Sequence, residues 1–140
     1  MITLKNSLFF LALSCASLSA TAEVAVIVNS SNANATMSSS DISRIFLGKS
    51  SKFPDGSQAK AVDQNDDSAA RNEFNDKVLG KTASQLKSYW SRLIFTGKGT
   101  PPKQVGTDAD VKAAVASNPS AIGYIDSSAV DASVKVVNKF

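Results

Sequence analysis

Residues 24–28 limit the fold of this chain more than any other feature, because all five are apolar and four are β-branched. A strand with one solvent-facing side alternates apolar and polar residues, whereas a strand covered on both faces is an unbroken apolar run. Residues 24–28 therefore predict a buried central strand with helices packed on both sides of it.

The rest of the chain alternates helix and strand patterns. N-capping residues followed by apolar positions at helical spacing predict helices that begin after Ser38, Ser68, Thr82 and Thr107. Further strands are predicted at residues 59–63, 103–105, 121–125 and 134–137. No repeat or linker interrupts this order, which predicts a single three-layer α/β domain with a mostly parallel sheet over residues 23–140.

The clearest helix pattern follows Thr82, where apolar residues recur three and four positions apart. Tyr89 and Trp90 belong to this series, and Phe95 follows it. An aromatic group of this kind could serve as a stacking platform, but its helical spacing favours packing in the core. We therefore expect these three aromatic residues to be buried.

Residues 1–22 have the pattern of a cleaved secretory signal. Lys5 supplies the positive start, residues 8–13 the apolar stretch, and residues 20–22 an Ala-Thr-Ala cleavage site before Glu23. The apolar stretch is shorter than the roughly 20 residues that a membrane span needs. A lipoprotein signal at Cys15 is the alternative, but Ala12 stands where such sites usually have Leu. The sequence thus predicts export, with a mature domain of residues 23–140.

Composition excludes several classes of function. The chain has no His, and its single Cys lies in residues 1–22, so the mature domain can form no Ser-His-Asp or Cys-His nucleophile, zinc site of these ligands or disulfide. The mature domain keeps 14 of the 15 basic residues and all 12 acidic ones, a dispersed excess that does not indicate nucleic-acid binding. We expect a binding protein without metal or cofactor, with a carboxylate-only hydrolase using Asp66 and Asp67 as a minor alternative.

Two loops are candidates for a ligand site, because ligands of such sheets collect beyond the carboxyl ends of the strands. The first loop, residues 29–36, begins with Asn29, and the second, residues 63–68, contains Gln64 and Asn65. If both strands run in the same direction, the two loops lie at one edge of the sheet. Asn29, Gln64 and Asn65 are therefore predicted ligand-binding residues.

Arg71 is the most informative residue near the second loop. A cation in the first turn of a helix opposes the helix dipole by some tenths of a kcal/mol unless an anion is present. Ser68, the neighbouring backbone amides and Arg71 could together hold an oxyanion. The alternative is structural, since Asp63, Asp66 and Asp67 are near enough in sequence to neutralise Arg71.

Several blocks of the chain, at matching spacing, resemble one family. The chain is similar to the phosphate ABC transporter substrate-binding proteins, a group of type 2 periplasmic binding proteins, at residues 45–49, 53–56, 68–74, 89–99, 101–102 and 118–124. The resemblance implies that the chain corresponds to one of the two lobes of such a protein. It also implies a periplasmic location.

In that family, the segment before the helix that matches residues 68–79 contributes to oxyanion binding. Ser68 and Arg71 are at matching positions, but the Ser-Gly-Thr of the family is Ser-Ala-Ala here, at residues 68–70. The change from Gly to Ala narrows the approach to the backbone, and the change from Thr to Ala removes a donor.

The resemblance implies an exported solute-binding protein that binds phosphate or a related oxyanion for ABC-type uptake or sensing. Its partners would be that small anion and a membrane transporter or receptor. A second copy of the chain, or another protein, would supply the missing wall of the site. The alternative is an envelope interaction module that has kept the binding-protein fold without a ligand.

Overall fold

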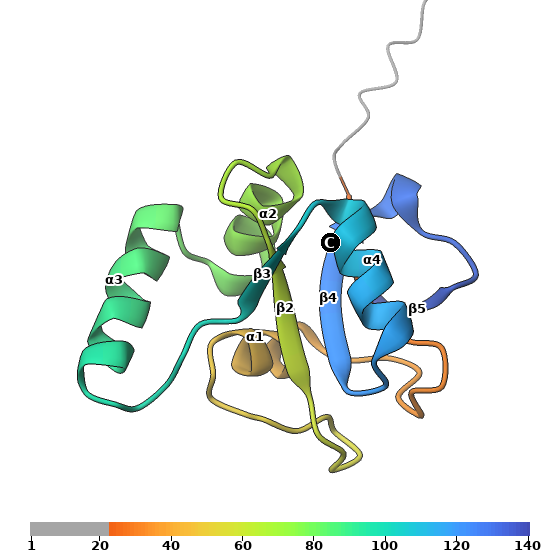
Figure 1. Cartoon of the computed structure of the whole chain (residues 1–140), viewed down its shortest axis with the longest axis horizontal. Helices are drawn as coiled ribbons and strands as arrows, with labels where there is room; N and C mark the ends of the chain where they lie inside the picture. Colours follow the sequence, from red (N-terminus) through yellow and green to blue (C-terminus); the bar gives the residue numbers. More distant parts are fainter. Residues whose placement is uncertain (1–22) are drawn as a thin grey trace, which may run out of the picture.

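The computed structural model describes residues 23–140, which form a five-stranded sheet with helices on both faces (Figure 1). The predicted signal, residues 1–22, lies outside the described residues. The strands are β1 (Val24–Asn29), β2 (Lys60–Gln64), β3 (Lys103–Gly106), β4 (Ala121–Asp126) and β5 (Val134–Lys139), and their order across the sheet is β3-β2-β4-β1-β5. Each strand predicted from the sequence is present, with bounds that shift by at most two residues.

Strand direction differs from the prediction. β2 is parallel to β3 and β4, but β1 is antiparallel to both of its neighbours, β4 and β5. Four strands thus run one way and β1 runs the other way, so the sheet is mixed rather than mostly parallel in its pairings. The unbroken apolar run at residues 24–28 reports burial on both faces, and burial does not determine direction.

β1 connects two separate cores. Val24, Val26 and Val28 face one core, whereas Ala25 and Ile27 face the other. All six residues of β1 are buried. The prediction of a strand covered on both faces is confirmed.

The helices of the two outer layers contribute the rest of each core. Ile42 and Phe46 of α1 (Ser39–Phe46) and Phe74 of α2 (Ala69–Phe74) pack in the first core. α2 continues directly into a π-helical turn, η1 (Asn75–Leu79). Val111 and Val115 of α4 (Asp108–Ser117) pack in the second core, and a short helix, η2 (Ser127–Ala129), precedes β5.

α4 lies so close to β4 that only glycine fits at the point of contact. A Cβ atom added to Gly123 would lie 2.5 Å from a methyl carbon of Val111. Figure 1 shows α4 crossing in front of the sheet at this level. Gly123 therefore sets the distance between this helix and the sheet.

The helix predicted after Thr82 is present as α3 (Ala83–Phe95), with the expected capping box between Thr82 and Gln85. It stands beside the sheet rather than on it (Figure 1). Phe95 is 93% exposed, and Leu86 is the buried residue of this helix. Tyr89 and Trp90 are only partly buried and belong to neither core, so the expectation that the aromatic group lies in the core is wrong for all three residues. Within residues 23–140, no helix has the length and apolar character needed to span a membrane.

Candidate functional site

The second predicted loop lies at the carboxyl end of β2, where α2 begins. Ser68 caps α2, and its hydroxyl oxygen accepts a hydrogen bond from the backbone N–H of Arg71 at 3.2 Å. The N–H of Asn65 donates to the carbonyl of Gly106 at 3.0 Å, which ties the loop to the end of β3. Four of the predicted site residues, Gln64, Asn65, Ser68 and Arg71, are therefore gathered at one edge of the sheet.

Gln64 is only 1% exposed, and all of its polar atoms have partners. Its Nε2 donates to Asp108 Oδ1 at 2.7 Å and to the carbonyl of Tyr124 at 2.8 Å. Its Oε1 accepts a hydrogen bond from the Ser68 hydroxyl at 2.5 Å. Gln64 thus holds together the ends of β2 and β4 and the starts of α2 and α4.

Arg71 forms ion pairs within the chain. Its Nε lies 3.4 Å from Asp63 Oδ2, and its Nη1 contacts Asp66 Oδ1, which also accepts a hydrogen bond from Gln104 at 2.9 Å. The side chains of Arg71 and Asp63 are 15% and 14% exposed, whereas that of Asp66 is 81% exposed. The Nε atom is buried without a well-aligned hydrogen bond. Two of the three carboxylates considered for internal neutralisation therefore do contact Arg71.

Tyr124 is part of this site, although the sequence analysis did not single it out. Its phenol donates a hydrogen bond to Asp63 Oδ1, and its ring stacks on Phe74 with centroids 4.1 Å apart. Burial, with the negative charge of Asp63 as the second cause, raises the pKa of Tyr124 far above its ordinary value. Tyr124 is therefore a protonated donor. The sequence did contain one indication of its role, because Tyr124 is a polar-tipped residue within the apolar strand pattern of residues 121–125.

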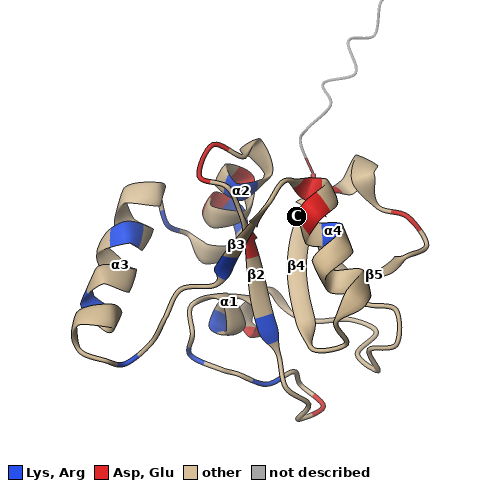
Figure 2. Ribbon diagram, viewed as in Figure 1, with Lys and Arg blue, Asp and Glu red and all other residues tan. Residues whose placement is uncertain are grey.

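The surface at this edge is a hollow of about 290 Å³ without a cation in its lining. The hollow is bounded by Gln64, Asn65, Asp67, Ser68, Gly106, Thr107 and Asp108. Figure 2 shows acidic segments gathered around the starts of α2 and α4, while basic segments mark α3 and the lower parts of β2 and β3. The hollow thus offers carboxylates, a hydroxyl and amides, and Arg71 lies beside it.

Asn29 lies at the opposite end of the sheet from the other four residues. Its Nδ2 donates to the carbonyls of Val115 at 2.9 Å and Ala116 at 3.0 Å, near the end of α4. Its Oδ1 accepts from the backbone N–H and the hydroxyl of Ser31. The expectation that both loops share one edge is wrong, because β1 runs antiparallel to β4 and its carboxyl end lies beside the start of β4.

Comparison with known proteins gives a consistent fold. A model of the PBP superfamily domain matches residues 16–139. No curated protein gave a match to this sequence.

Several solved structures share the fold, among them three phosphate-related proteins. The phosphate-bound structure of a protein assigned to the phosphate ABC transporter substrate-binding proteins, from Clostridium perfringens, has a TM-score of 0.67 at 24% identity. An ABC-type phosphate transport receptor from Vibrio cholerae gives 0.66 at 21%, and PstS from Borrelia burgdorferi gives 0.60 at 12%. Each alignment covers 84% of this chain but only 45%, 46% and 47% of the respective structures, so the chain spans less than half of their length.

Proposed function

The chain belongs to the PBP superfamily, and from this premise we propose that it is an exported, one-lobed solute-binding protein for phosphate or a related oxyanion. The fold is that of phosphate-binding proteins, one of which was solved with phosphate bound. The observation that carries the proposal is the placement of Ser68 and Arg71 together at the carboxyl end of β2, with an exposed carboxylate, Asp66, as the replaceable partner of Arg71.

Each group at this edge has a role toward an oxyanion. The Ser68 hydroxyl and the backbone N–H groups at the start of α2 are donors, and Arg71 can exchange Asp66 for the ligand. Asp67 and Asp108 line the hollow and are acceptors. Phosphate near neutral pH keeps a proton that can be donated to a carboxylate, whereas sulfate has none. An acidic wall therefore favours phosphate over sulfate.

The described residues form one wall of the site, and a tightly held ligand would need a second wall. The hollow is shallow, and the matched phosphate-binding structures are more than twice as long as the portion that this chain covers. A ligand held by one lobe remains exposed to water, which weakens binding. A second copy of the chain, or an envelope transporter or receptor, would close the site. Light scattering with and without phosphate distinguishes a second copy from a different protein.

Thermal unfolding in millimolar phosphate, with sulfate as the control, tests the binding. A ligand at a hundred times its dissociation constant adds about 2.7 kcal/mol, which raises the unfolding midpoint by several degrees in a domain of this size. We expect a rise with phosphate and none with sulfate.

Variants at the two ends of the ion pair sharpen this test. Arg71→Ala should abolish the phosphate-induced rise, and Asp66→Asn should enlarge it, because the guanidinium loses its competing carboxylate. Glu73→Gln is the matched control, since Glu73 lies on α2 but pairs with Lys77. A phosphate response that is the same in all three variants would refute this site.

Export is the second part of the proposal. Residues 1–22 carry the signal pattern, so the periplasmic form of the protein should begin at Glu23. Mass spectrometry of the protein from a periplasmic fraction measures this directly. Recovery of the uncleaved chain in the cytoplasmic fraction would contradict export.

An envelope interaction module is the second candidate. It is favoured by the internal hydrogen bonds and ion pairs that already occupy Gln64, Ser68 and Arg71. This function predicts no thermal response to any small anion and one reproducible partner after crosslinking in the envelope. The phosphate titration therefore decides between the two.

A further inference from the structure

A larger cavity lies beside the first residues of β2, away from the candidate site. It is a groove of about 660 Å³, and it shares no lining residue with the hollow at the carboxyl end of β2. β3 pairs with β2 only from Val62 onward, so the groove crosses the edge of the sheet at Lys60 and Ala61. Its size is within the range of about 300–1,000 Å³ that is typical of small-molecule sites.

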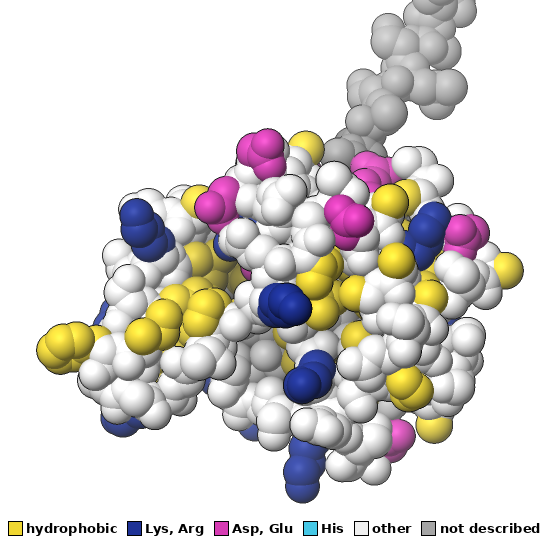
Figure 3. All heavy atoms as spheres, in the orientation of Figure 1, with side chains coloured by type: hydrophobic (Ala, Val, Ile, Leu, Met, Phe, Trp, Pro, Cys, Tyr) yellow, Lys and Arg dark blue, Asp and Glu magenta, His cyan; other side chains and the backbone are white. Residues whose placement is uncertain are grey.

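One side of the groove is apolar. Phe46 of α1, Ala61 of β2 and Trp90 of α3 line it, together with Pro101 and Pro102. Figure 3 shows apolar side chains along the space between α3 and the rest of the protein. These residues come from α1, β2, α3 and the loop before β3, and they offer an aromatic or aliphatic body a place out of water.

The position of Trp90 depends on Gly48. Gly48 has a φ of +72°, and a Cβ atom added there would lie 3.1 Å from the indole ring of Trp90. The turn after α1 therefore brings its backbone against the indole, and the Tyr89 hydroxyl donates to the carbonyl of Leu47 at 2.6 Å beside it. The apolar wall is thus fixed by packing and by a hydrogen bond.

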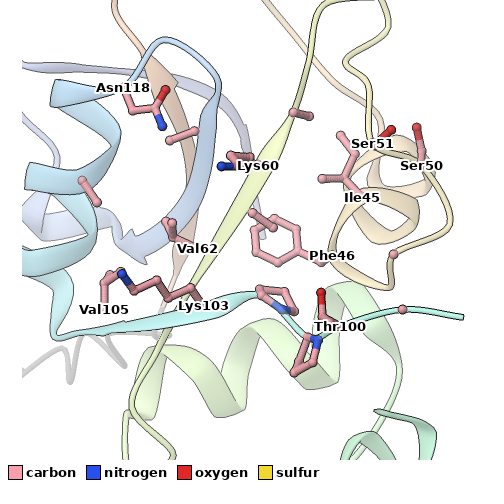
Figure 4. Close-up of a pocket in the computed structure, with 18 of the residues that line it drawn as sticks. Ile45, Phe46, Ser50, Ser51, Lys60, Val62, Thr100, Lys103, Val105 and Asn118 are labelled. Atoms are coloured by element: carbon pink, nitrogen blue, oxygen red, sulfur yellow. The ribbon is translucent and has the colours of Figure 1, made fainter. Parts of the chain in front are cut away.

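The other side of the groove is cationic. Lys60 projects from β2 toward Asn118, and Lys103 projects from β3 toward Val105 (Figure 4). No Asp or Glu is among the residues that line the groove. Within residues 23–140, the side chains of Lys60 and Lys103 form no ion pair, unlike that of Lys112, which pairs with Asp131 at 2.9 Å.

Two ammonium groups that share a groove without a counter-charge favour an anionic occupant. Inorganic phosphate would leave the apolar wall uncovered, whereas a neutral apolar molecule would leave the lysines unpaired. We propose that the groove binds an amphipathic organic anion, with its apolar body against Trp90, Pro101 and Pro102 and its carboxylate or sulfonate between Lys60 and Lys103. This inference does not rest on the proposed phosphate function.

A matched pair of probes tests the proposal. Anilinonaphthalene sulfonate has an aromatic body and one anionic group, and phenylnaphthylamine has the same body without the charge. Trp90 is the only tryptophan of the chain, so its fluorescence reports on the groove. We expect the sulfonate to quench Trp90 on binding, and the neutral probe to bind at least about tenfold more weakly.

Variants of the two lysines test whether they bind the anionic group of the probe. Lys60→Gln and Lys103→Gln should each weaken sulfonate binding by about tenfold while leaving the neutral probe unaffected. Lys87→Gln is the matched control, because Lys87 is exposed on α3 and does not line the groove. Phe95→Ser tests whether the probe binds the exposed end of α3 instead of the groove. This variant should leave probe binding unchanged.

Three results would overturn the proposal. They are sulfonate binding without quenching of Trp90, equal affinity for the two probes, and loss of binding in Phe95→Ser. Millimolar phosphate should not displace the sulfonate probe, and Arg71→Ala should not alter its affinity. These two measurements distinguish a wrong proposal for the groove from a wrong proposal for the phosphate site.

Discussion

At the carboxyl end of β2, Arg71 pairs with two carboxylates and two more line the neighbouring hollow, whereas the groove at the start of the same strand has two lysines and no carboxylate. In the first region Gln64, Ser68 and Arg71 are already bonded to neighbouring residues. In the second, Lys60 and Lys103 have no charged partner among the described residues. The family resemblance thus points to the carboxyl end of β2, where the polar groups already have partners. The positive charges without a partner lie in the groove at the start of the strand.

The largest expected effect on stability is at the carboxyl end of β2. Gln64→Leu removes the donor to Asp108 and to the buried carbonyl of Tyr124, and it removes the acceptor of the Ser68 hydroxyl. We expect the free energy of unfolding to fall by about 3 kcal/mol, measured by urea denaturation. Gln104→Leu is the comparison, because Gln104 is exposed and should cost less than about 1 kcal/mol. Similar losses in both variants would contradict a special role for Gln64.

Asn29 is a buried polar residue at the other end of the sheet, near the groove, and its side chain also has hydrogen-bond partners. Asn29→Ala removes the donor to the carbonyls of Val115 and Ala116 near the end of α4, and should cost about 2 kcal/mol in chemical denaturation. Its phosphate response should equal that of the unmodified protein. Loss of that response would show that Asn29 acts on the ligand, despite lying at the far end of the sheet.

Tyr124 gives the first region a dependence on alkaline pH. Burial raises the pKa of Tyr124, so the folded protein keeps the phenolic proton while the unfolded chain loses it above about pH 10. The contribution of Tyr124 is therefore complete below about pH 10 and is lost at up to about 1.4 kcal/mol per pH unit above it. Denaturation of the protein and of Tyr124→Phe should show a stability difference that shrinks above about pH 10. A constant difference would refute this.

The smallest effect is expected in the groove. The double variant Lys60→Gln and Lys103→Gln should change the free energy of unfolding by less than about 0.5 kcal/mol, because neither ammonium has a partner to lose. Lys112→Gln, which loses Asp131 and the carbonyl of Ala129, should cost more in the same denaturation assay. A large loss in the double variant would mean that the two lysines support the fold.

Much of the fold could be predicted from local signals. The apolar run at residues 24–28 predicted burial of β1 on both faces, and the Thr82 capping box predicted the start of α3. The direction of β1 could not be predicted, because it depends on pairing with β4 and β5, far along the chain. The exposure of Phe95 was also missed, since helical spacing identifies an apolar face but not the surface that covers it.

The candidate site could be located from the sequence but not described. Ser68 as a cap and Arg71 near carboxylates follow from spacings of a few residues. The contacts from Gln64 to Asp108 and Tyr124 join residues that are 44 and 60 positions apart. The groove was not predicted because α1, β2, α3 and α4 all contribute to it. Such assemblies follow from strand order, which local patterns do not contain.

The position of β1 also has a consequence for the order in which the protein forms during synthesis. β1 is the first strand to be made, yet its two partners are β4 and β5, and Val24 exchanges backbone hydrogen bonds with Phe140 at 2.9 Å in each direction. Residues from Ala121 onward must therefore be available before the middle of the sheet can begin to close. Until then, β1, the most apolar segment of the described chain, has no strand partner. It can bind chaperones or aggregate during that time.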